Sequence, residues 1–222
     1  MKQKRCDSIV GGLQVSALEQ NFLLAGVGGQ GTLLAADVVA LVGMKLGLDV
    51  KKSEVHGMAQ RGGSVTSHVR WGKKVASPLI EPGEVDFMIA FERLEGLRYA
   101  HMTRPGGVLL INDYRIAPVT VASGSKIYPS EVDEELAYAS VVRSVCGDNC
   151  IERMYVPAVA IAQEMGNSRV NNIIILGALS ALLPDVPEEL WLEVISERVP
   201  SRYVQLNRTA FTTGRAYMQG HS

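Results

Sequence analysis

Short apolar runs and longer, mostly apolar segments alternate along the chain, and their lengths predict strands and helices respectively. The runs of strand length lie at residues 22–26, 50–55, 64–71, 85–91, 108–112 and 151–156. The segments of helical length lie at residues 32–46, 93–103, 131–139, 157–165, 171–183, 185–199 and 204–218. Because strands alternate with helices, we expect an α/β fold with helices on both faces of the sheet. The predicted architecture is a three-layer α/β/α, Rossmann-like domain with a largely parallel, mixed sheet and a helical C-terminal part.

The pattern also predicts a strand near a sheet edge, a turn, and the limits of the domain. Polar and apolar residues alternate in 64–71, which is typical of a strand at or near an edge. Arginine, proline and two glycines at 104–107 predict a turn. Residues 1–20 have a mixed composition. We expect them to form an N-terminal extension and a single domain to span residues 21–222.

Composition and charge narrow the classes of protein to which this chain can belong. The formal net charge is −1 over 222 residues, which argues against a nucleic-acid-binding protein. The longest apolar stretches, such as 173–183, are too short to span a bilayer, so no membrane segment is expected. The basic N-terminus is followed by no long apolar run and therefore does not resemble a secretory signal. We expect a cytoplasmic protein.

The cysteines and histidines argue against a metal centre in this chain. The three cysteines, Cys6, Cys146 and Cys150, form no CxxC pair, which excludes a ferredoxin-type iron–sulfur cluster held by this chain alone. Their odd number favours a reducing compartment. The four histidines are scattered, and none has the HExxH spacing. The sequence therefore predicts no metal site.

A glycine-rich loop lies between the first predicted strand and the first predicted helix. Gly26, Gly28 and Gly31 match the pattern GxGxxG, in which glycine permits a tight turn and a helix N-terminus offers free N–H groups to an anion. Glu54, at the end of the next predicted strand, is placed to bind a ribose hydroxyl, as in a dinucleotide site. The alternative is that these glycines only let the helix and strand pack closely, without a ligand.

A second glycine-containing loop follows the second predicted strand, and a dinucleotide fold does not require it. Arg61 precedes Gly62 and Gly63 and a predicted strand, so its guanidinium can project from a tight loop. Basic residues exceed acidic ones by seven to two between Lys45 and Lys74. This excess suits a polyanionic ligand or an acidic partner, although a solvated basic face would give the same composition.

Three motifs together resemble one known family. They are the glycine loop at 26–31, the segment 53–65 with its His-Gly-Met-Ala-Gln-Arg-Gly-Gly core, and a Gly-Asn pair at 166–167 followed by paired asparagines at 171–172. They resemble the gamma-type domain of the 2-oxoacid:ferredoxin oxidoreductases, over about residues 21–218. The second loop is most similar to that of the indolepyruvate branch, whose beta subunit is the small one.

The resemblance implies a non-autonomous subunit of a larger enzyme. The complete enzyme would oxidatively decarboxylate an aryl 2-oxoacid to an acyl-CoA and reduce ferredoxin. Thiamine diphosphate, magnesium, iron–sulfur clusters and coenzyme A would act through a large partner subunit, with none held firmly by this chain. Ferredoxin would be a partner through the complex. Two other hypotheses stay open: a stand-alone NAD- or FAD-binding oxidoreductase, and a non-catalytic scaffold.

The candidate site residues come from the two glycine-containing loops: Gly26, Gly28, Gly29, Gln30, Gly31, Arg61, Gly62 and Gly63. Residues 28–31 are expected to present donors at a helix N-terminus to a phosphate or to the partner. Arg61 is expected to clamp a carboxylate or phosphate with two hydrogen bonds. His56 and Gln60 are candidates for orienting the substrate or for ordering the loop. Because His56 has no visible catalytic partner, ordering is favoured for it.

One further pattern is interpreted as structural. Gly147, Asp148 and Asn149, with the asparagines at 171–172, are similar to a thiamine diphosphate motif, but an asparagine stands where that motif has its final glycine. The sequence instead predicts that Asn167 and Asn171 cap helices and tie loops.

Overall fold

The computed structural model describes residues 19–56, 63–116, 128–146 and 151–221. A six-stranded sheet crosses the molecule, formed by β1 (Gln20–Val27), β2 (Asp49–His56), β3 (Ser64–Gly72), β4 (Val85–Ala90), β5 (Thr103–Asn112) and β6 (Glu152–Val156). The helices are α1 (Thr32–Lys45), α2 (Arg93–Tyr99), α4 (Glu131–Cys146), α5 (Ala158–Glu164), α6 (Asn171–Ala181), α7 (Glu188–Arg198) and α8 (Val204–Gln219). Short 3-10 turns lie at Ala100–Met102, Ser168–Val170 and Ser201–Tyr203.

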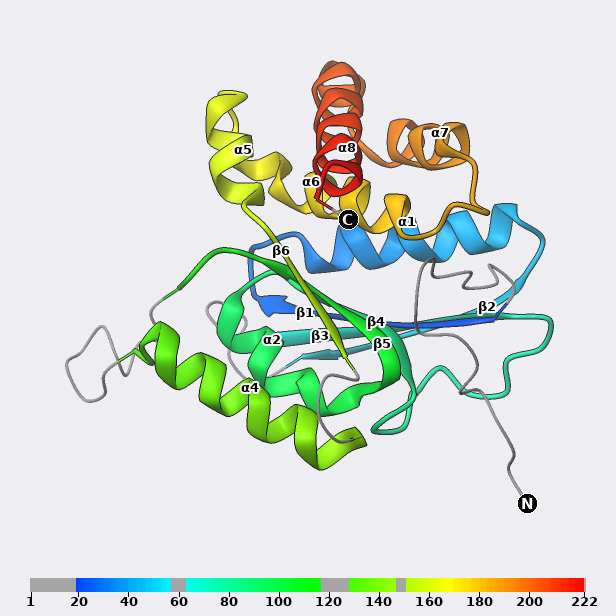
Figure 1. The fold of residues 1–222 in the computed structure, drawn as a ribbon. Helices are drawn as coiled ribbons and strands as arrows, with labels where there is room; N and C mark the ends of the chain where they lie inside the picture. Colours follow the sequence, from blue (N-terminus) through cyan, green and yellow to red (C-terminus); the bar gives the residue numbers. More distant parts are fainter. Residues whose placement is uncertain (1–18, 57–62, 117–127, 147–150, 222) are drawn as a thin grey trace.

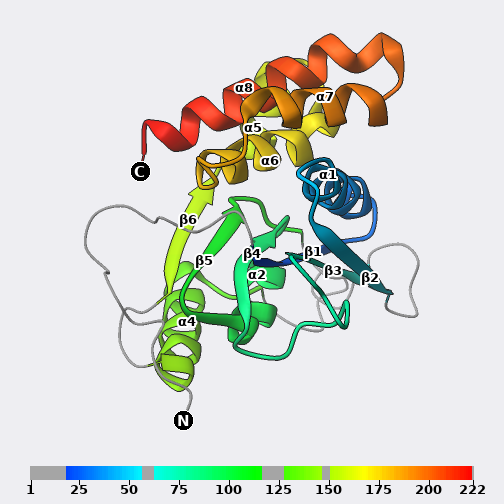
Figure 2. The ribbon, with the colours of Figure 1, turned by 90° about the vertical axis from the view of Figure 1, so that its right-hand side faces the viewer.

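The sheet is mixed, and helices cover both of its faces. The strand order is β2-β3-β1-β4-β5-β6. Strands β1, β4, β5 and β6 are parallel, whereas β3 is antiparallel to both β1 and β2. Helix α1 and the C-terminal helices lie on one side of the sheet, and α2 and α4 lie on the other (Figures 1 and 2). The predicted three-layer α/β class is therefore confirmed, as is the position of β3 near an edge.

Each face of the sheet has its own apolar core. On the side of α1, Phe22 stacks on Phe87 with ring centroids 5.6 Å apart and lies 4.6 Å from the ring of Trp71. On the side of α2 and α4, Met88 and Tyr138 belong to a second buried cluster. All six residues of β4 are buried, as expected for a central strand covered on both faces.

Helices α6 and α8 cross at very short range in the C-terminal layer. A Cβ atom on Gly177 would collide with the carbonyl oxygen of Phe211, and one on Gly214 would collide with the carbonyl oxygen of Ile174. Glycine at both positions lets the two backbones touch, which brings α8 onto the buried face of α6. This layer covers α1 and so supports the loop that precedes it.

The predicted turn at 104–107 is wrong, because these residues belong to β5. Thr103 pairs with Val85, and the pairing register then shifts before Phe87. Gly106 has a φ of +74°, a left-handed conformation that favours glycine. The sequence signal therefore marks an irregularity inside a strand rather than a break between elements.

Two predicted helix ends also differ from the structure. Helix α2 stops at Tyr99 and continues only as a 3-10 turn, so the predicted helix 93–103 is too long. Helix α4 continues to Cys146, well beyond residue 139, and buries Tyr138 and Val142 against the second core. Within the described residues, no helix is long and apolar enough to cross a membrane.

Candidate functional site

The first glycine loop lies at the carboxyl end of β1 and leads directly into α1. A Cβ atom on Gly26 would lie 2.7 Å from Oγ1 of Thr32 and 3.1 Å from Cβ of Phe91. Gly31 has a φ of +79°, and a Cβ atom there would collide with the side-chain amide of Asn172 on α6. Close packing therefore requires glycine at these two positions. In α/β folds this end of the sheet is where ligands bind.

Gln30 braces the loop from within. Its Oε1 accepts a hydrogen bond from the amide of Val27 at 2.7 Å. Its Nε2 donates to the carbonyl oxygen of Phe91, at the end of β4, at 2.8 Å. Both polar ends of the side chain thus bind the protein itself. Its backbone amide also donates within the loop, to Val27, so the donor predicted at residue 30 is already engaged.

A backbone hydrogen bond joins the two glycine-containing loops. The amide of Gly28 donates to the carbonyl oxygen of Gly63 at 3.0 Å, and the amide of Gln30 donates to the carbonyl oxygen of Val27 at 3.1 Å. Among the described residues, none accepts from the amides of Gly29 and Gly31. The N-cap residue of α1 is Gly31, which has no side chain with which to cap the helix. These two amides and the helix N-terminus are the donors that an anion can reach.

The second loop leaves and enters the sheet at this same end. His56 is the last residue of β2 and pairs with Val65 of β3, which pairs on its other side with Gly26 of β1. The carboxyl ends of β2 and β1 therefore lie on either side of the start of β3, at the same edge of the sheet. The predicted site residues Gln60, Arg61 and Gly62 lie outside the described residues.

Glu54 does not lie beside the first glycine loop. It pairs with Ser67 of β3, which in turn pairs with Leu24 of β1, so β3 separates it from β1 by two strand spacings, about 10 Å. In a dinucleotide-binding fold the second strand is the direct neighbour of the first. The ribose-binding role predicted for Glu54 is therefore wrong in this topology. Its Oε1 instead accepts from Nζ of Lys52 at 2.7 Å.

Helix α2 begins with two buried carboxylates that bind neighbouring segments. Glu92 is 1% exposed, and its Oε1 accepts from the amide of Ile116 at 3.2 Å and from the hydroxyl of Tyr128 at 2.6 Å. Glu95 is 4% exposed, and its Oε2 accepts from Oγ of Ser64 at 2.5 Å. Burial raises the pKa of the Glu95 carboxyl, and the hydrogen bond from Ser64 opposes that rise.

Sequence reasoning did not single out these two glutamates. The available signal was a pair of acidic residues, Glu92 and Glu95, directly after a buried strand and at the start of a helix. Oε2 of Glu92 accepts from the amide of Glu95 at 3.1 Å and so caps α2. An ion-pair cluster continues beside them, because Nε of Arg93 donates to Oε2 of the fully buried Glu134 at 2.7 Å.

The asparagines near α6 have structural roles. The side chain of Asn167 accepts from the amide of Arg169 at 3.0 Å and caps a 3-10 turn, as predicted. Nδ2 of Asn171 donates to the carbonyl oxygen of Ser168 at 2.6 Å and ties the same turn. Nδ2 of Asn172 donates to the carbonyl oxygen of Gly31 at 3.3 Å. The third sequence motif therefore contacts the first, while residues 147–150 lie outside the described part of the chain.

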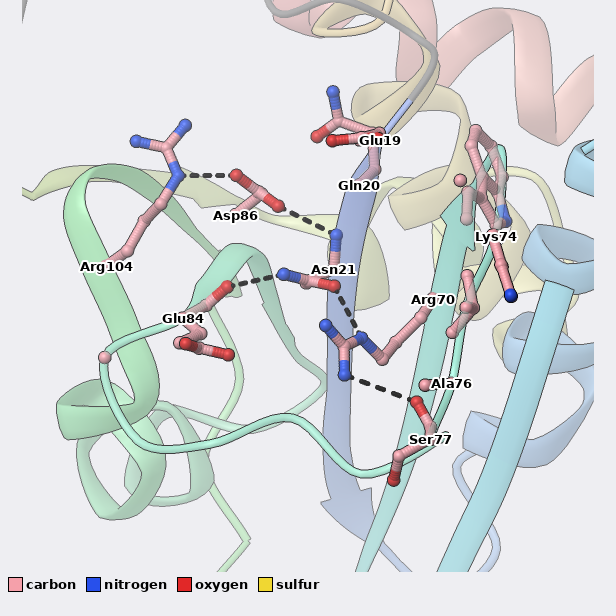
Figure 3. Close-up of a pocket in the computed structure, with 14 residues that line it drawn as sticks. Glu19, Gln20, Asn21, Arg70, Lys74, Ala76, Ser77, Glu84, Asp86 and Arg104 are labelled. Atoms are coloured by element: carbon pink, nitrogen blue, oxygen red, sulfur yellow. Dashed lines mark hydrogen bonds and ion pairs between the residues drawn. The ribbon is translucent and has the colours of Figure 1, made fainter. Parts of the chain in front are cut away.

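A cavity of about 550 Å³ opens at the opposite end of the sheet, where β1 and β4 begin (Figure 3). Its charged lining residues are Glu19, Glu84, Asp86, Arg70, Lys74 and Arg104. Asp86 already accepts from Nε of Arg104 at 2.5 Å and from the amide of Asn21 at 2.8 Å. The three acidic and three basic side chains give the lining no net formal charge, so it does not favour an anion. The glycine loops, at the other end, are the candidate site.

The described residues contain no cluster of histidine, cysteine and acidic side chains that could hold a metal ion. The donors at the candidate site are backbone amides and a helix N-terminus. Such a site suits an anionic ligand rather than a cation.

Comparison with known proteins assigns the chain to a family. Residues 21–217 match the model of the pyruvate ferredoxin/flavodoxin oxidoreductase family. The chain is 37% identical to indolepyruvate oxidoreductase subunit IorB of Thermococcus kodakarensis, over 88% of this chain and 94% of that protein. It is 38% identical to subunit IorB of Archaeoglobus fulgidus, over 87% and 92% of the two chains.

The fold has the same counterpart among solved structures. The gamma subunit of a keto/oxoacid ferredoxin oxidoreductase from Geobacter sulfurreducens superposes with a TM-score of 0.65 and 24% identity, over 90% of this chain and 99% of that one. The resemblance drawn from the sequence motifs is thereby confirmed. The chain belongs to the pyruvate ferredoxin/flavodoxin oxidoreductase family.

Proposed function

We propose that this chain is the small subunit of a ferredoxin-dependent oxidoreductase that converts indolepyruvate, or another aryl pyruvate, to an acyl-CoA. Three relatives above 35% identity are indolepyruvate oxidoreductase subunits, and they support this substrate class. A larger partner subunit supplies the redox and decarboxylation chemistry, and ferredoxin accepts the electrons from the complex. The odd cysteine count fits a reducing compartment, and we propose the cytoplasm.

The residues of this chain do not fit the cofactors of that chemistry. The three cysteines include no CxxC pair for an iron–sulfur cluster, and the sequence at 147–149 lacks the final glycine of the thiamine diphosphate motif. We therefore assign thiamine diphosphate, magnesium and the clusters to the larger subunit. This chain contributes binding and positioning.

The single observation that carries the proposal for the site is the hydrogen bond between Gly28 and Gly63, which brings the two loops together. The amides of Gly29 and Gly31 stand at the N-terminus of α1, where a phosphate group of coenzyme A would gain from the helix dipole. Arg61 belongs to the loop that ends at Gly63 and is proposed to bind the same anion. His56 and Gln60 are proposed to order that loop.

The larger subunit is proposed to dock on this end of the sheet. Three large apolar side chains there are exposed: Leu33 by 39%, Val55 by 51% and Tyr114 by 39%. They lie in the first turn of α1, near the end of β2 and two residues after the end of β5. Protein interfaces typically combine exposed apolar groups with surrounding polar ones, and a partner buries the apolar groups.

Co-expression with the larger subunit tests the assembly. We expect a fixed-ratio complex that oxidises indolepyruvate in a coenzyme A-dependent reaction and reduces ferredoxin. The variant Tyr114→Ser is expected to weaken the complex, whereas Leu136→Ser, at a site on α4 that is 66% exposed, serves as the matched control. A chain that forms no complex and supports no 2-oxoacid oxidation would contradict the proposal and favour a scaffold.

Coenzyme A affinity of the reconstituted enzyme tests the anion site. We expect Arg61→Ala to weaken coenzyme A binding by about tenfold or more, because it removes a charged hydrogen bond. Arg169→Ala, on an exposed turn, is the control. Unchanged affinity and turnover for the Arg61 variant would overturn its role as a clamp.

A further inference from the structure

The start of β3 is held from the side of α2 by two side chains. Oγ of Ser64 donates to Oε2 of Glu95 at 2.5 Å. The hydroxyl of Tyr99 lies 3.2 Å from the same Oγ. Because a serine hydroxyl has one proton and Glu95 accepts it, the Tyr99 hydroxyl is the donor in the second contact. Ser64 is thus fixed by an acceptor and a donor that both belong to α2.

Glu95 occupies a place where a carboxylate is costly. It is only 4% exposed, and burying a charge disfavours folding unless hydrogen bonds or an opposite charge compensate. The compensation is partial: Nε of Arg98 lies 3.4 Å from Oε1, and the first turn of α2 offers its dipole. An apolar side chain would avoid this cost but would leave the Ser64 hydroxyl without its acceptor.

The contact with Ser64 reaches the first glycine loop in two further steps. The residue before it, Gly63, accepts at its carbonyl oxygen from the amide of Gly28. Ser64 itself pairs with Val27, the last residue of β1. The place of Gly63 therefore depends on where Glu95 holds Ser64, and the orientation of the Gly29 and Gly31 amides depends on Gly28.

We propose that Ser64 and Glu95 are positioning residues, which hold Gly63 against Gly28 and so orient the Gly29 and Gly31 amides of the first glycine loop toward an anionic ligand. The inference rests on the proposed function for its ligand, coenzyme A. It extends that function by naming side chains, remote from the ligand, that set its affinity.

The test uses the reconstituted complex with the variants Ser64→Ala, Glu95→Ala and the double variant. Each single variant is expected to raise KM for coenzyme A about tenfold, while kcat changes less than about twofold. The double variant is expected to match the single ones, since either change breaks the same contact. Ser64→Thr keeps the hydroxyl and is expected to restore KM. Glu164→Ala, at an exposed site on α5, is the control.

Hydrogen exchange of the full chain alone separates this inference from the proposed function. The Gly28 amide is expected to exchange about tenfold faster in Ser64→Ala than in the unaltered chain, with the central strand β4 unaffected. If Glu95→Ala does not fold, Ser64→Ala and Ser64→Thr carry the test. Unchanged exchange at Gly28 would overturn the inference, whether or not the complex oxidises a 2-oxoacid. Additive effects of the two substitutions on KM would overturn it as well.

Discussion

The carbonyl oxygen of Gly63 accepts a hydrogen bond from the amide of Gly28 at 3.0 Å, so that the first glycine loop and the residue preceding β3 form one unit. Neither residue has a side chain, and the contact is made by backbone alone. The antiparallel pairing of β3 with β1 brings Gly28 and Gly63 together. Substitutions around this unit should therefore act by changing the backbone conformation and packing.

Gly31 is expected to tolerate alanine less well than another glycine with the same backbone conformation. Gly31 and Gly47 have φ values of +79° and +78°, but an added Cβ meets Asn172 at Gly31 and nothing within 4 Å at Gly47. Gly47→Ala should lower the free energy of unfolding by about 1 kcal/mol through backbone strain, and Gly31→Ala by about 3 kcal/mol through strain and overpacking. Urea denaturation measures both, and equal losses would contradict the role assigned to Asn172.

Gln30 is expected to be sensitive to the replacement of its amide by a carboxylate. In Gln30→Glu the acceptor for the Val27 amide remains, but a carboxylate oxygen then faces the carbonyl oxygen of Phe91 in place of a donor. We expect a loss of about 2 kcal/mol in the free energy of unfolding near neutral pH. Because the carboxylate is disfavoured in the fold, its folded pKa lies above the unfolded value of about 4.3. The loss should shrink as the pH falls through the folded pKa and vanish below about pH 4.3, where the carboxyl group is protonated and can donate. A loss that does not vary with pH would rule out this explanation.

The contact between α6 and α8 is expected to be destabilised by the addition of a single methyl group. Gly177→Ala or Gly214→Ala would drive a Cβ atom into a facing backbone carbonyl, and we expect each to cost about 3 kcal/mol or to shift α8. Gly220→Ala is the matched control, because its Cβ would lie 3.6 Å from the nearest atom. Thermal unfolding of the three variants checks the prediction, which is contradicted if all three have the same Tm.

Asp37 is expected to make the stability depend on acidic pH. Partial burial raises the pKa of this carboxyl, but hydrogen bonds and charges from Lys52 and Arg198 outweigh burial and hold the pKa below its usual value. With a folded pKa below the unfolded value of about 3.9, the ion pairs stabilise the fold above that pH. This stabilisation is lost as the pH falls through the folded pKa.

The variant Asp37→Asn tests this dependence. It should lower the free energy of unfolding by about 1 kcal/mol near pH 7, since the pairs are partly exposed, and the difference should vanish in strong acid. Denaturation curves for both proteins across this range provide the measurement. A difference that persists at low pH would show that the ion pairs do not act through the charge of Asp37.

The local pattern of apolar and polar residues was sufficient to predict most helices and strands, because buried positions are occupied by apolar residues. The apolar run of β4 and the glycines flanking α1 are examples. The order in which strands lie side by side in the sheet produces no such pattern. The residues of β3 predict a strand, but not its insertion between β1 and β2, and this insertion removes Glu54 from the first glycine loop.

Contacts between distant segments explain the other differences. The second half of α4 contains β-branched valines, which have modest helix propensity, yet the burial of Val142 extends the helix to Cys146. Glu92 meets Ile116 and Tyr128 only after the chain has folded. The first glycine loop could be found from sequence because the left-handed backbone at Gly29 and Gly31 and the close approach at Gly26 demand glycine locally.

The pairing of β3 with β1 along the whole stretch from Ser64 to Trp71 has a consequence for how this chain can change in length. Side chains alternate between the two faces of a strand, so one inserted residue would turn the Ser64 hydroxyl toward α1 and displace Gly63 by about 3.4 Å. Insertions and deletions should therefore be tolerated between β3 and β4 but not within β3, whose pairing register with β1 places Gly63 next to Gly28.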